Sequence, residues 1–380
     1  GLRLQEATDG LNAFGKIFAK MALTSGIIPQ ITAVFGNCGG GLSVIPALSD
    51  FTFMEESKAQ LFVNSPNAIS GNRKELCDTA NAKFQSEEAG LVDFVGSEEE
   101  IIAQMRALVD IIPSNYEDID ILDCEDDLNR ACSGIENCVE DTTIAVSMIA
   151  DQHNVIEVKK AYAPEMLTAF IRLNGATVGV VANRTKMYDE DMNVVGEFED
   201  KLTAKGCSKA ADFVTFCDAF DIPVLTLTNT SGFAASANIE KNLAQATAKL
   251  IYSYATATVP KVNVVIGKAY GSAYITMGCK AVETDVVYAW PTAQIGMMDS
   301  TNAVKIIYAD EIAQSDDALA TINEKVEQYN NIQSSVEAAA SRGYVDTIIA
   351  PVDTRKYVIG AFEMLYTKRE ELPDKKHGTV

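Results

Sequence analysis

The sequence predicts an α/β fold that is built twice within one chain. Three observations lead to this prediction: a repeat between the two halves, alternating strand and helix patterns, and a small-residue turn after a buried strand in each half. Pro29 begins a strand that runs into Gly39-Gly40-Gly41, and Pro260 begins a matching strand and turn 231 residues later. Gly1-Leu2 falls on Gly232-Phe233 in the same register, so each copy carries two small-residue loops.

In the first copy, apolar residues at helical spacing predict a helix that ends before Gly26 and Pro29. The Ala59-Gln60 pair recurs as Ala293-Gln294, where the offset has drifted by three residues. The expected elements are a helix over residues 5–25, strands over 31–35, 51–54 and 61–63, a helix from the glycine turn through 45–48, and an amphipathic helix over 97–112.

In the second copy, buried strands alternate with longer helices. The expected helices cover residues 141–149, 208–220, 237–251, 303–308, 322–340 and 355–369. The expected strands cover residues 155–158, 167–173, 177–181, 222–228, 262–266, 286–288 and 295–298. Because the first copy starts at Gly1, it has no counterpart to residues 166–231. We therefore expect a piece of a longer polypeptide, whose N-terminal domain lacks its first strands here.

Residues 116–140 are acidic and lack sustained periodicity. This composition predicts a solvated connection between two domains and favours that interpretation over a metal site. The predicted domains are therefore residues 1–138 and residues 139–380, with the connection at about 116–140.

The composition excludes several classes of function. A net charge of −22 with 31 Lys and Arg residues argues against binding of nucleic acid. Only His153 and His377 are present, which leaves no His-rich metal site and no conventional Ser-His-Asp arrangement, and we expect no metal. The eight cysteines contain no Cys-x-x-Cys pair, so we expect them to be free, buried and reduced, as in a cytosolic protein. No uninterrupted apolar stretch is long enough to cross a membrane.

The glycine turns carry the predicted chemistry. Gly39-Gly40-Gly41 lies between a strand and a helix, where backbone N–H groups lack helical partners and glycine allows close approach. With an N–H group from the Gly1-Leu2 loop, this turn predicts an oxyanion hole. Gly271-Ser272-Ala273 with Gly232-Phe233 predicts a second one. Tight strand–helix packing alone would explain one such turn, whereas two in one register favour a function.

These segments resemble the carboxyltransferase subunits of biotin-dependent acyl-CoA carboxylases, transcarboxylases and decarboxylases, in the propionyl-CoA and methylmalonyl-CoA branch. The resemblance extends over nearly the whole chain and is weakest over residues 66–140. The matching stretches are residues 1–6, 25–30, 46–54, 216–223, 257–262, 268–271 and 288–293. The resemblance implies a tandem pair of crotonase-like domains.

The resemblance also implies roles for the predicted loops. The N-terminal domain would bind acyl-CoA and hold its enolate through Leu2, Gly40 and Gly41. The C-terminal domain of a neighbouring subunit would hold the biotin ureido oxyanion through Phe233, Gly271, Ser272 and Ala273. The residues expected to line the two pockets are Gly1, Gly39, Leu42, Gly232, Tyr270 and Ile275. Proton transfer by the ureido nitrogen would explain why no histidine is required.

Partners follow from the same resemblance. Ala19-Lys20-Met21 lies inside a predicted helix and is not a biotinylation site, so biotin would arrive on a separate carrier protein or domain. The expected partners are a biotin carboxyl carrier protein with biotin carboxylase, or membrane decarboxylase subunits. A homo-oligomer, a trimer of dimers, is expected in the bacterial cytosol, either free or peripheral to a membrane complex.

Three positions depart from the family. Ser231 takes the place of the proline in the Pro-Gly-Phe that is common in the family. Ser272 takes the place of the second glycine in the family's Gly-Gly-Ala. Ile275 replaces an Asp that many propionyl-type members carry, which leaves the acyl group open between propionyl or methylmalonyl, acetyl or malonyl, and glutaconyl types.

Two alternative functions stay open from the sequence. A biotin-free crotonase-type hydratase or isomerase would need a catalytic Glu near the first turn, and none lies between Gly36 and Met54. A non-catalytic CoA-binding scaffold subunit is the other. Asp50, Asp285 and Asp299 lie near the loops as candidate general bases, although packing or helix capping is the favoured role for each.

Overall fold

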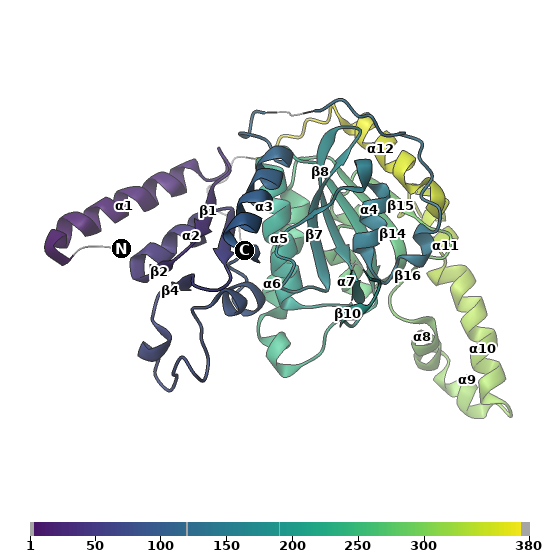
Figure 1. Cartoon of the computed structure of the whole chain (residues 1–380). Coiled ribbons are helices and arrows are strands. Elements are labelled where there is room, and N and C mark those ends of the chain that lie inside the picture. The colour runs from purple at the N-terminus through teal and green to yellow at the C-terminus, as the bar shows by residue number, and fades with distance from the viewer. Residues whose placement is uncertain (1–3, 119–120, 190, 374–380) are drawn as a thin grey trace. The chain divides into compact units, whose positions relative to one another are not determined.

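The computed structural model describes residues 4–118, 121–189 and 191–373, which form two compact units (Figure 1). The first unit comprises the described residues of Gly1–Asp120 with Ile156–Pro164 and Ala219–Asp221. The second comprises the described residues of Ile121–Val155, Glu165–Asp218 and Ile222–Val380. The predicted division into functional domains at residues 138 and 139 stays a prediction.

The first unit is organised around a short parallel sheet in the order β1-β3-β5. Phe53 and Met54 of the central strand are fully buried, and the rings of Phe53 and Phe94 stack with centroids 4.6 Å apart. The helices α2 and α3 contact this sheet. The helices are α1 (Ala7–Thr24), α2 (Val44–Leu48) and α3 (Glu98–Ile111). The strands are β1 (Ile31–Val34), β2 (Asn37–Gly39), β3 (Phe51–Glu55), β4 (Gln60–Phe62), β5 (Phe94–Gly96) and β6 (Ile156–Glu157).

The second unit contains a larger sheet with the strand order β17-β15-β14-β12-β8-β7, in which β16 also pairs with β14. β7 (Met166–Leu173) and β8 (Ala176–Asn183) form an antiparallel hairpin, and the other pairs are parallel. The remaining strands of this sheet are β12 (Val224–Thr230), β14 (Lys261–Tyr270), β15 (Val286–Ala289), β16 (Gln294–Gly296) and β17 (Thr347–Ile348). Two smaller pairs join β9 (Lys186–Tyr188) to β10 (Val194–Glu197) and β11 (Lys201–Leu202) to β13 (Gly232–Phe233).

Helices cover both faces of the larger sheet. On one face, Leu167, Ala169 and Ile171 share a core with the apolar sides of α4 (Thr142–Ile149) and α12 (Thr354–Leu365). Phe170 points to the other face, where its ring lies 4.9 Å from that of Phe213 in α5 (Ala204–Ala219). Alternate side chains of a strand point to opposite faces, so the near-continuous apolar strands match a sheet that is covered on both sides. The α/β prediction is confirmed.

The register of the strands confirms the sequence repeat. Asn37 of β2 lies opposite Gln60 of β4, and Lys268 of β14 lies opposite Gln294 of β16. Asn37 and Lys268 are 231 residues apart, and the two glutamines belong to the repeated Ala-Gln pairs. α6 (Ala237–Thr256) corresponds to α1 in the same way.

The repeat extends further than the sequence analysis found. Gly90 and Gly343 both have a positive φ, 67° and 79°, and each begins a segment that ends in Val-Asp before a strand. Asp93 accepts a hydrogen bond from the backbone N–H of Thr52 (2.7 Å), and Asp346 accepts one from that of Val287 (2.8 Å). These carboxylates fix the third strand of each copy to its neighbour.

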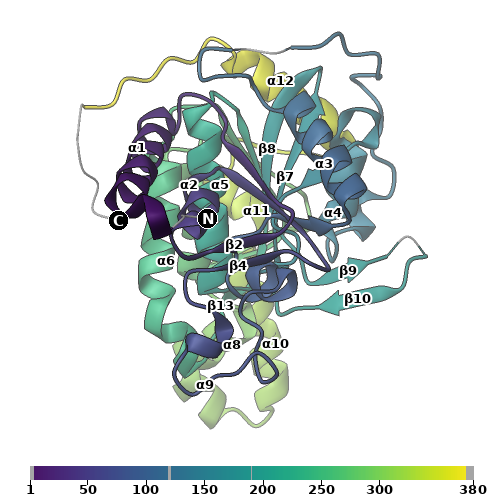
Figure 2. The same cartoon turned by 60° about the vertical axis from the view of Figure 1, so that its left-hand side comes forward.

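The second copy is longer than the first because it carries a helical arm between β16 and β17. The arm of α8 (Ser300–Ile307), α9 (Ala309–Gln314) and α10 (Ala318–Tyr329) extends away from the sheet of the second unit (Figure 2). The helix that was predicted over residues 322–340 is interrupted by a π-helical turn at Asn330–Ser334. Ser335 then caps α11 (Val336–Ser341) by accepting from the N–H of Ala338, which explains the break.

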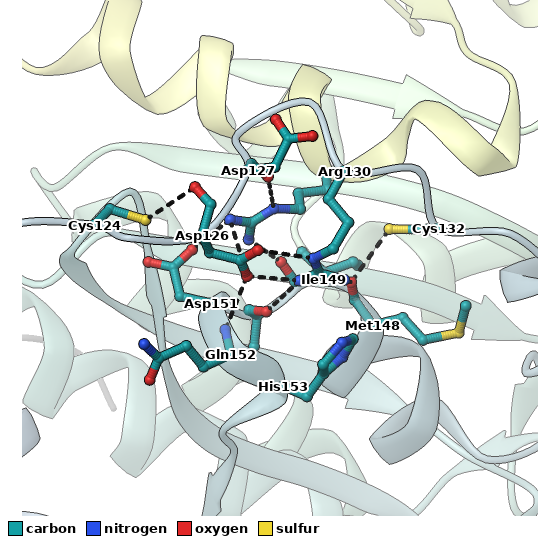
Figure 3. A network of polar contacts seen from close by, with 12 residues as sticks. Cys124, Asp126, Asp127, Arg130, Cys132, Met148, Ile149, Asp151, Gln152 and His153 are labelled. Atoms are coloured by element: carbon teal, nitrogen blue, oxygen red, sulfur yellow. Dashed lines mark hydrogen bonds and ion pairs between the residues drawn. The ribbon is translucent and has the colours of Figure 1, made fainter.

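Part of the acidic segment packs against its surroundings, although more than half of residues 121–140 are exposed, and its expected role as a solvated connection between domains stays a prediction. Cys132 and Ile135 are buried, and the carboxylate of Asp126 faces the side chain of Arg130 (Figure 3). The guanidinium of Arg355, which is completely buried, lies 2.6 Å from Asp151 and 3.6 Å from Asp126. A buried cation from α12 therefore neutralises part of the acidic charge.

Candidate active site

The two glycine turns have the same backbone conformation. Gly40 follows β2 with φ +61°, and Gly271 follows β14 with φ +57°. The preceding residues, Gly39 and Tyr270, are both extended, with φ −116° and −113°. A left-handed residue after a strand strongly favours glycine, which explains why the turn sequence recurs.

The first turn leads into a 3-10 helix, Gly40–Ser43, and then into α2. A Cβ atom added at Gly40 or Gly41 would meet nothing within 4 Å, whereas one at Gly39 would lie 2.6 Å from the ring of Phe62. The side of the turn at Gly40 and Gly41 is thus open, and Gly39 is needed for packing. Leu42 is half-buried and packs on the small core of this unit.

The second turn begins α7 (Gly271–Thr276), and the structure brings it beside β13 (Gly232–Phe233). Gly232 has φ +149°, and a Cβ atom there would meet nothing within 4 Å. Ser272 is exposed, Ala273 is buried, and Ile275 is 42% exposed on the outer side of the helix. The predicted residues of the second hole therefore lie together. Gly1 and Leu2, predicted for the first hole, lie outside the described residues.

The second turn has a polar partner, Gln294, that was not among the predicted site residues. The hydroxyl of Tyr270 is hydrogen-bonded to the amide oxygen of Gln294. Burial raises the pKa of Tyr270, and the charges of Asp299 and Asp200 add to this effect, so the phenol stays protonated near neutral pH. The only sequence signal was the repeated Ala-Gln pair, to which Gln294 belongs.

The three aspartates that were candidate general bases have structural partners. Asp50 accepts from the backbone N–H of Gln30 (2.7 Å), and Asp285 accepts from that of Lys261 (2.8 Å). Asp299 caps α8 by accepting from two backbone N–H groups. The favoured structural roles are confirmed for these residues.

Within residues 4–118, 121–189 and 191–373, no group of three His, Cys, Asp or Glu side chains is placed to hold a metal ion. No described helix combines the length and apolar character needed to cross a membrane. All eight cysteines are free; five are buried, Cys124 and Cys138 are partly buried, and Cys77 is exposed, contrary to the expectation that all are buried.

A family model described as "Carboxyl transferase domain" matches residues 1–380. The chain therefore belongs to the carboxyl transferase family, a class of enzymes, and the predicted resemblance is confirmed. It is 35% identical over 393 residues to the methylmalonyl-CoA decarboxylase subunit alpha of Propionigenium modestum, covering 100% of this chain and 74% of that protein. It is also 35% identical over 393 residues to the carboxyltransferase subunit of propionyl-CoA carboxylase from Haloferax mediterranei, with the same coverage.

The fold also matches a solved structure of the same family. A crystal structure of transcarboxylase 12S, described as a hexamer with hydrolysed methylmalonyl-coenzyme A bound, superposes with a TM-score of 0.90 at 35% identity. The match covers 100% of this chain and 73% of that chain. The predicted crotonase-like architecture is confirmed by this match.

Proposed function

We propose that this protein moves a carboxyl group between a short-chain acyl-CoA and biotin that is carried on a separate protein. Methylmalonyl-CoA and propionyl-CoA are the favoured pair, because the related enzymes are named for them. The C–C bond to the carboxyl group breaks and leaves an enolate, the carboxyl group passes to the ureido nitrogen, and the proton of that nitrogen passes to the enolate carbon.

The observation that carries this proposal is the pair of turns with one backbone conformation. Each turn presents N–H groups at the start of a helix, where they lack helical partners. The first turn, with Gly40 and Gly41, would stabilise the thioester enolate together with Leu2. The second turn, with Gly271, Ser272 and Ala273, would stabilise negative charge on the ureido oxygen together with Phe233. Both charges develop in one carboxyl transfer, so two holes suit this reaction.

The alternative of a biotin-free hydratase has less support. The first glutamate after the first turn is Glu55, and its carboxylate accepts hydrogen bonds from the side chain of Ser57 and the backbone N–H groups of Lys58 and Ala59. These donors stabilise the ionised carboxylate in a structural turn and leave it a poor general base. Among the described residues, no feature favours the scaffold alternative.

The partner and assembly belong to the same proposal. Carrier-bound biotin would come from a biotin carboxyl carrier protein or from a decarboxylase subunit, in a trimer of dimers in which the first turn of one subunit works with the second turn of its neighbour. The location would be the cytosol, either free or at a membrane complex.

Gly40→Val and Gly271→Val test the proposal. A valine at positive φ distorts the turn, and loss of one oxyanion donor lowers kcat by about 10²–10³-fold. Gly343→Val is the matched control, because Gly343 has φ +79°, lies outside both turns and has no atom within 4 Å of an added Cβ. The readout is transfer of labelled carboxyl from methylmalonyl-CoA to biocytin. Unchanged kcat in either turn variant, or equal loss in Gly343→Val, would contradict the two-hole mechanism.

A further inference from the structure

Asp200 joins the two backbone elements of the second turn. It directly precedes β11, which pairs with β13 through Lys201 opposite Gly232. One carboxylate oxygen of Asp200 accepts from the hydroxyl of Ser231 (2.6 Å), and the other accepts from the ammonium of Lys268 (2.8 Å). The side chain thus reaches both the loop before Phe233 and the strand before Gly271.

The backbone of Asp200 holds the same loop. Its carbonyl oxygen accepts from the N–H of Ser231 (2.7 Å), from the hydroxyl of Ser231 (3.2 Å) and from the hydroxyl of Thr230 (3.3 Å). A proline at this position would offer neither an N–H nor a hydroxyl donor and would instead fix its own φ. This chain therefore uses hydrogen bonds to Asp200 where a proline ring would restrict the loop. The restraint matters because the next residue, Gly232, has the conformational freedom of glycine.

Lys268, the other partner of the Asp200 carboxylate, lies on the strand that leads into the turn at Gly271. Lys268 lies three residues before Gly271 on β14, and its backbone N–H donates to the side chain of Asn229 (3.0 Å). The side chain of Lys268 is half exposed, so its ion pair alone contributes little. The hydroxyl of Ser231, by contrast, is held between the carboxylate and the carbonyl of one residue. Burial would raise the pKa of Asp200, but the hydrogen bonds from Lys268 and Ser231 outweigh it and lower this pKa, which keeps the carboxylate ionised near neutral pH.

We propose that Asp200 is a positioning residue: through Ser231 and Lys268 it sets the distance between the Gly232-Phe233 loop and the turn at Gly271. This inference rests on the proposed function, because it assigns the loop and the turn to one oxyanion hole. In this role Asp200 acts through the placement of backbone N–H groups. The geometry of such donors must be held closely, since a displacement of about 1 Å can lower a rate by about 100-fold.

The test compares Asp200→Ala, Asp200→Asn and Ser231→Ala with Asp212→Ala. Asp212 is a matched control, because it is an exposed aspartate of the same unit whose carboxylate pairs with Lys249 at 2.6 Å. Two readouts are needed: amide hydrogen exchange of residues 230–234, and steady-state transfer of labelled carboxyl from methylmalonyl-CoA to biocytin.

We expect Asp200→Ala to accelerate exchange in residues 230–234 about tenfold or more, because a freed loop opens more often. We expect kcat to fall by about 10- to 100-fold, while the KM for the CoA ester stays unchanged. Asp200→Asn keeps an acceptor for Ser231 but turns an amide NH2 donor toward the Lys268 ammonium, so it should lose the link to β14 and lower kcat by a smaller factor than Asp200→Ala. The kcat of Ser231→Ala should fall between those of Asp200→Ala and Asp200→Asn.

Each contrary outcome is distinct. Unchanged exchange in Asp200→Ala would overturn the link to the loop, whether or not the protein transfers carboxyl groups. Faster exchange with kcat equal to that of Asp212→Ala would overturn the positioning role. If the parent protein transfers no carboxyl group to biocytin, the proposed function fails, and the exchange data still decide whether Asp200 holds the loop.

Discussion

Replacing Arg355 by methionine should destabilise the second unit by about 3–5 kcal/mol, the range for removing one partner of a buried ion pair. The guanidinium is completely buried, donates to the carboxylate of Asp151 at 2.6 Å and also donates to the backbone carbonyls of Ile149 and Asp127. Methionine fills much of the same volume but leaves these acceptors without their donor, at a cost of about 1–3 kcal/mol for each buried group. Asp151 keeps the N–H of Gly175 at 2.8 Å, which limits the loss.

Urea unfolding measures this effect. With a slope of about 2–3 kcal/mol/M, a loss of 3–5 kcal/mol moves the midpoint by roughly 1–2.5 M. Lys356→Met is the matched control, because the neighbouring lysine is 42% exposed and pairs with Asp353, an arrangement worth about 1 kcal/mol or less. Equal midpoints for the two variants would refute the conclusion that Arg355 neutralises the acidic segment.

Two further changes test the same packing. The hydrogen bond from Arg130 lowers the pKa of Asp126 from 3.8 to about 2, so its contribution of roughly 2 kcal/mol is present above pH 4 and is lost as the pH falls through about 2. Asp126→Asn should therefore be less stable than the parent at pH 6 in urea unfolding, and equal stability at that pH would contradict the pairing. Gly175→Ala should lower the free energy of unfolding by several kcal/mol more than Gly343→Ala does. Both glycines have a positive φ, but an added Cβ at Gly175 would also lie 1.8 Å from the carbonyl oxygen of Leu122. Similar unfolding midpoints for these two alanine variants would show that residue 122 does not pack on this hairpin.

The sequence alone predicted the duplicated core because strand register and turn conformation leave direct marks in it. A left-handed residue at Gly40 and Gly271 required glycine in both copies, and the Ala-Gln pairs marked the strands opposite them. The later part of the repeat escaped notice because the helical arm lengthens the second copy. Gly90 and Gly343 are consequently 253 residues apart, and a fixed offset of 231 does not join them.

The acidic segment and the support of the second turn depend on contacts between distant residues. Composition shows that residues 116–140 are acidic, but not that Arg355 lies buried against Asp151, 204 residues away. The link between Asp200 and Ser231 likewise joins residues 31 positions apart, and Asp200 belongs to no motif. The single available signal was the departure at Ser231, which the sequence analysis recorded without a structural reason.

The most direct measurement uses the purified protein with biocytin and carboxyl-labelled malonyl-, methylmalonyl- and glutaconyl-CoA. The readout is loss of the label from each ester, with and without avidin. Carboxyl transfer to biotin predicts loss that avidin abolishes, fastest with methylmalonyl-CoA. If no ester loses its label although the CoA esters bind, the protein does not transfer carboxyl groups to biotin, and the two turns serve another reaction or none.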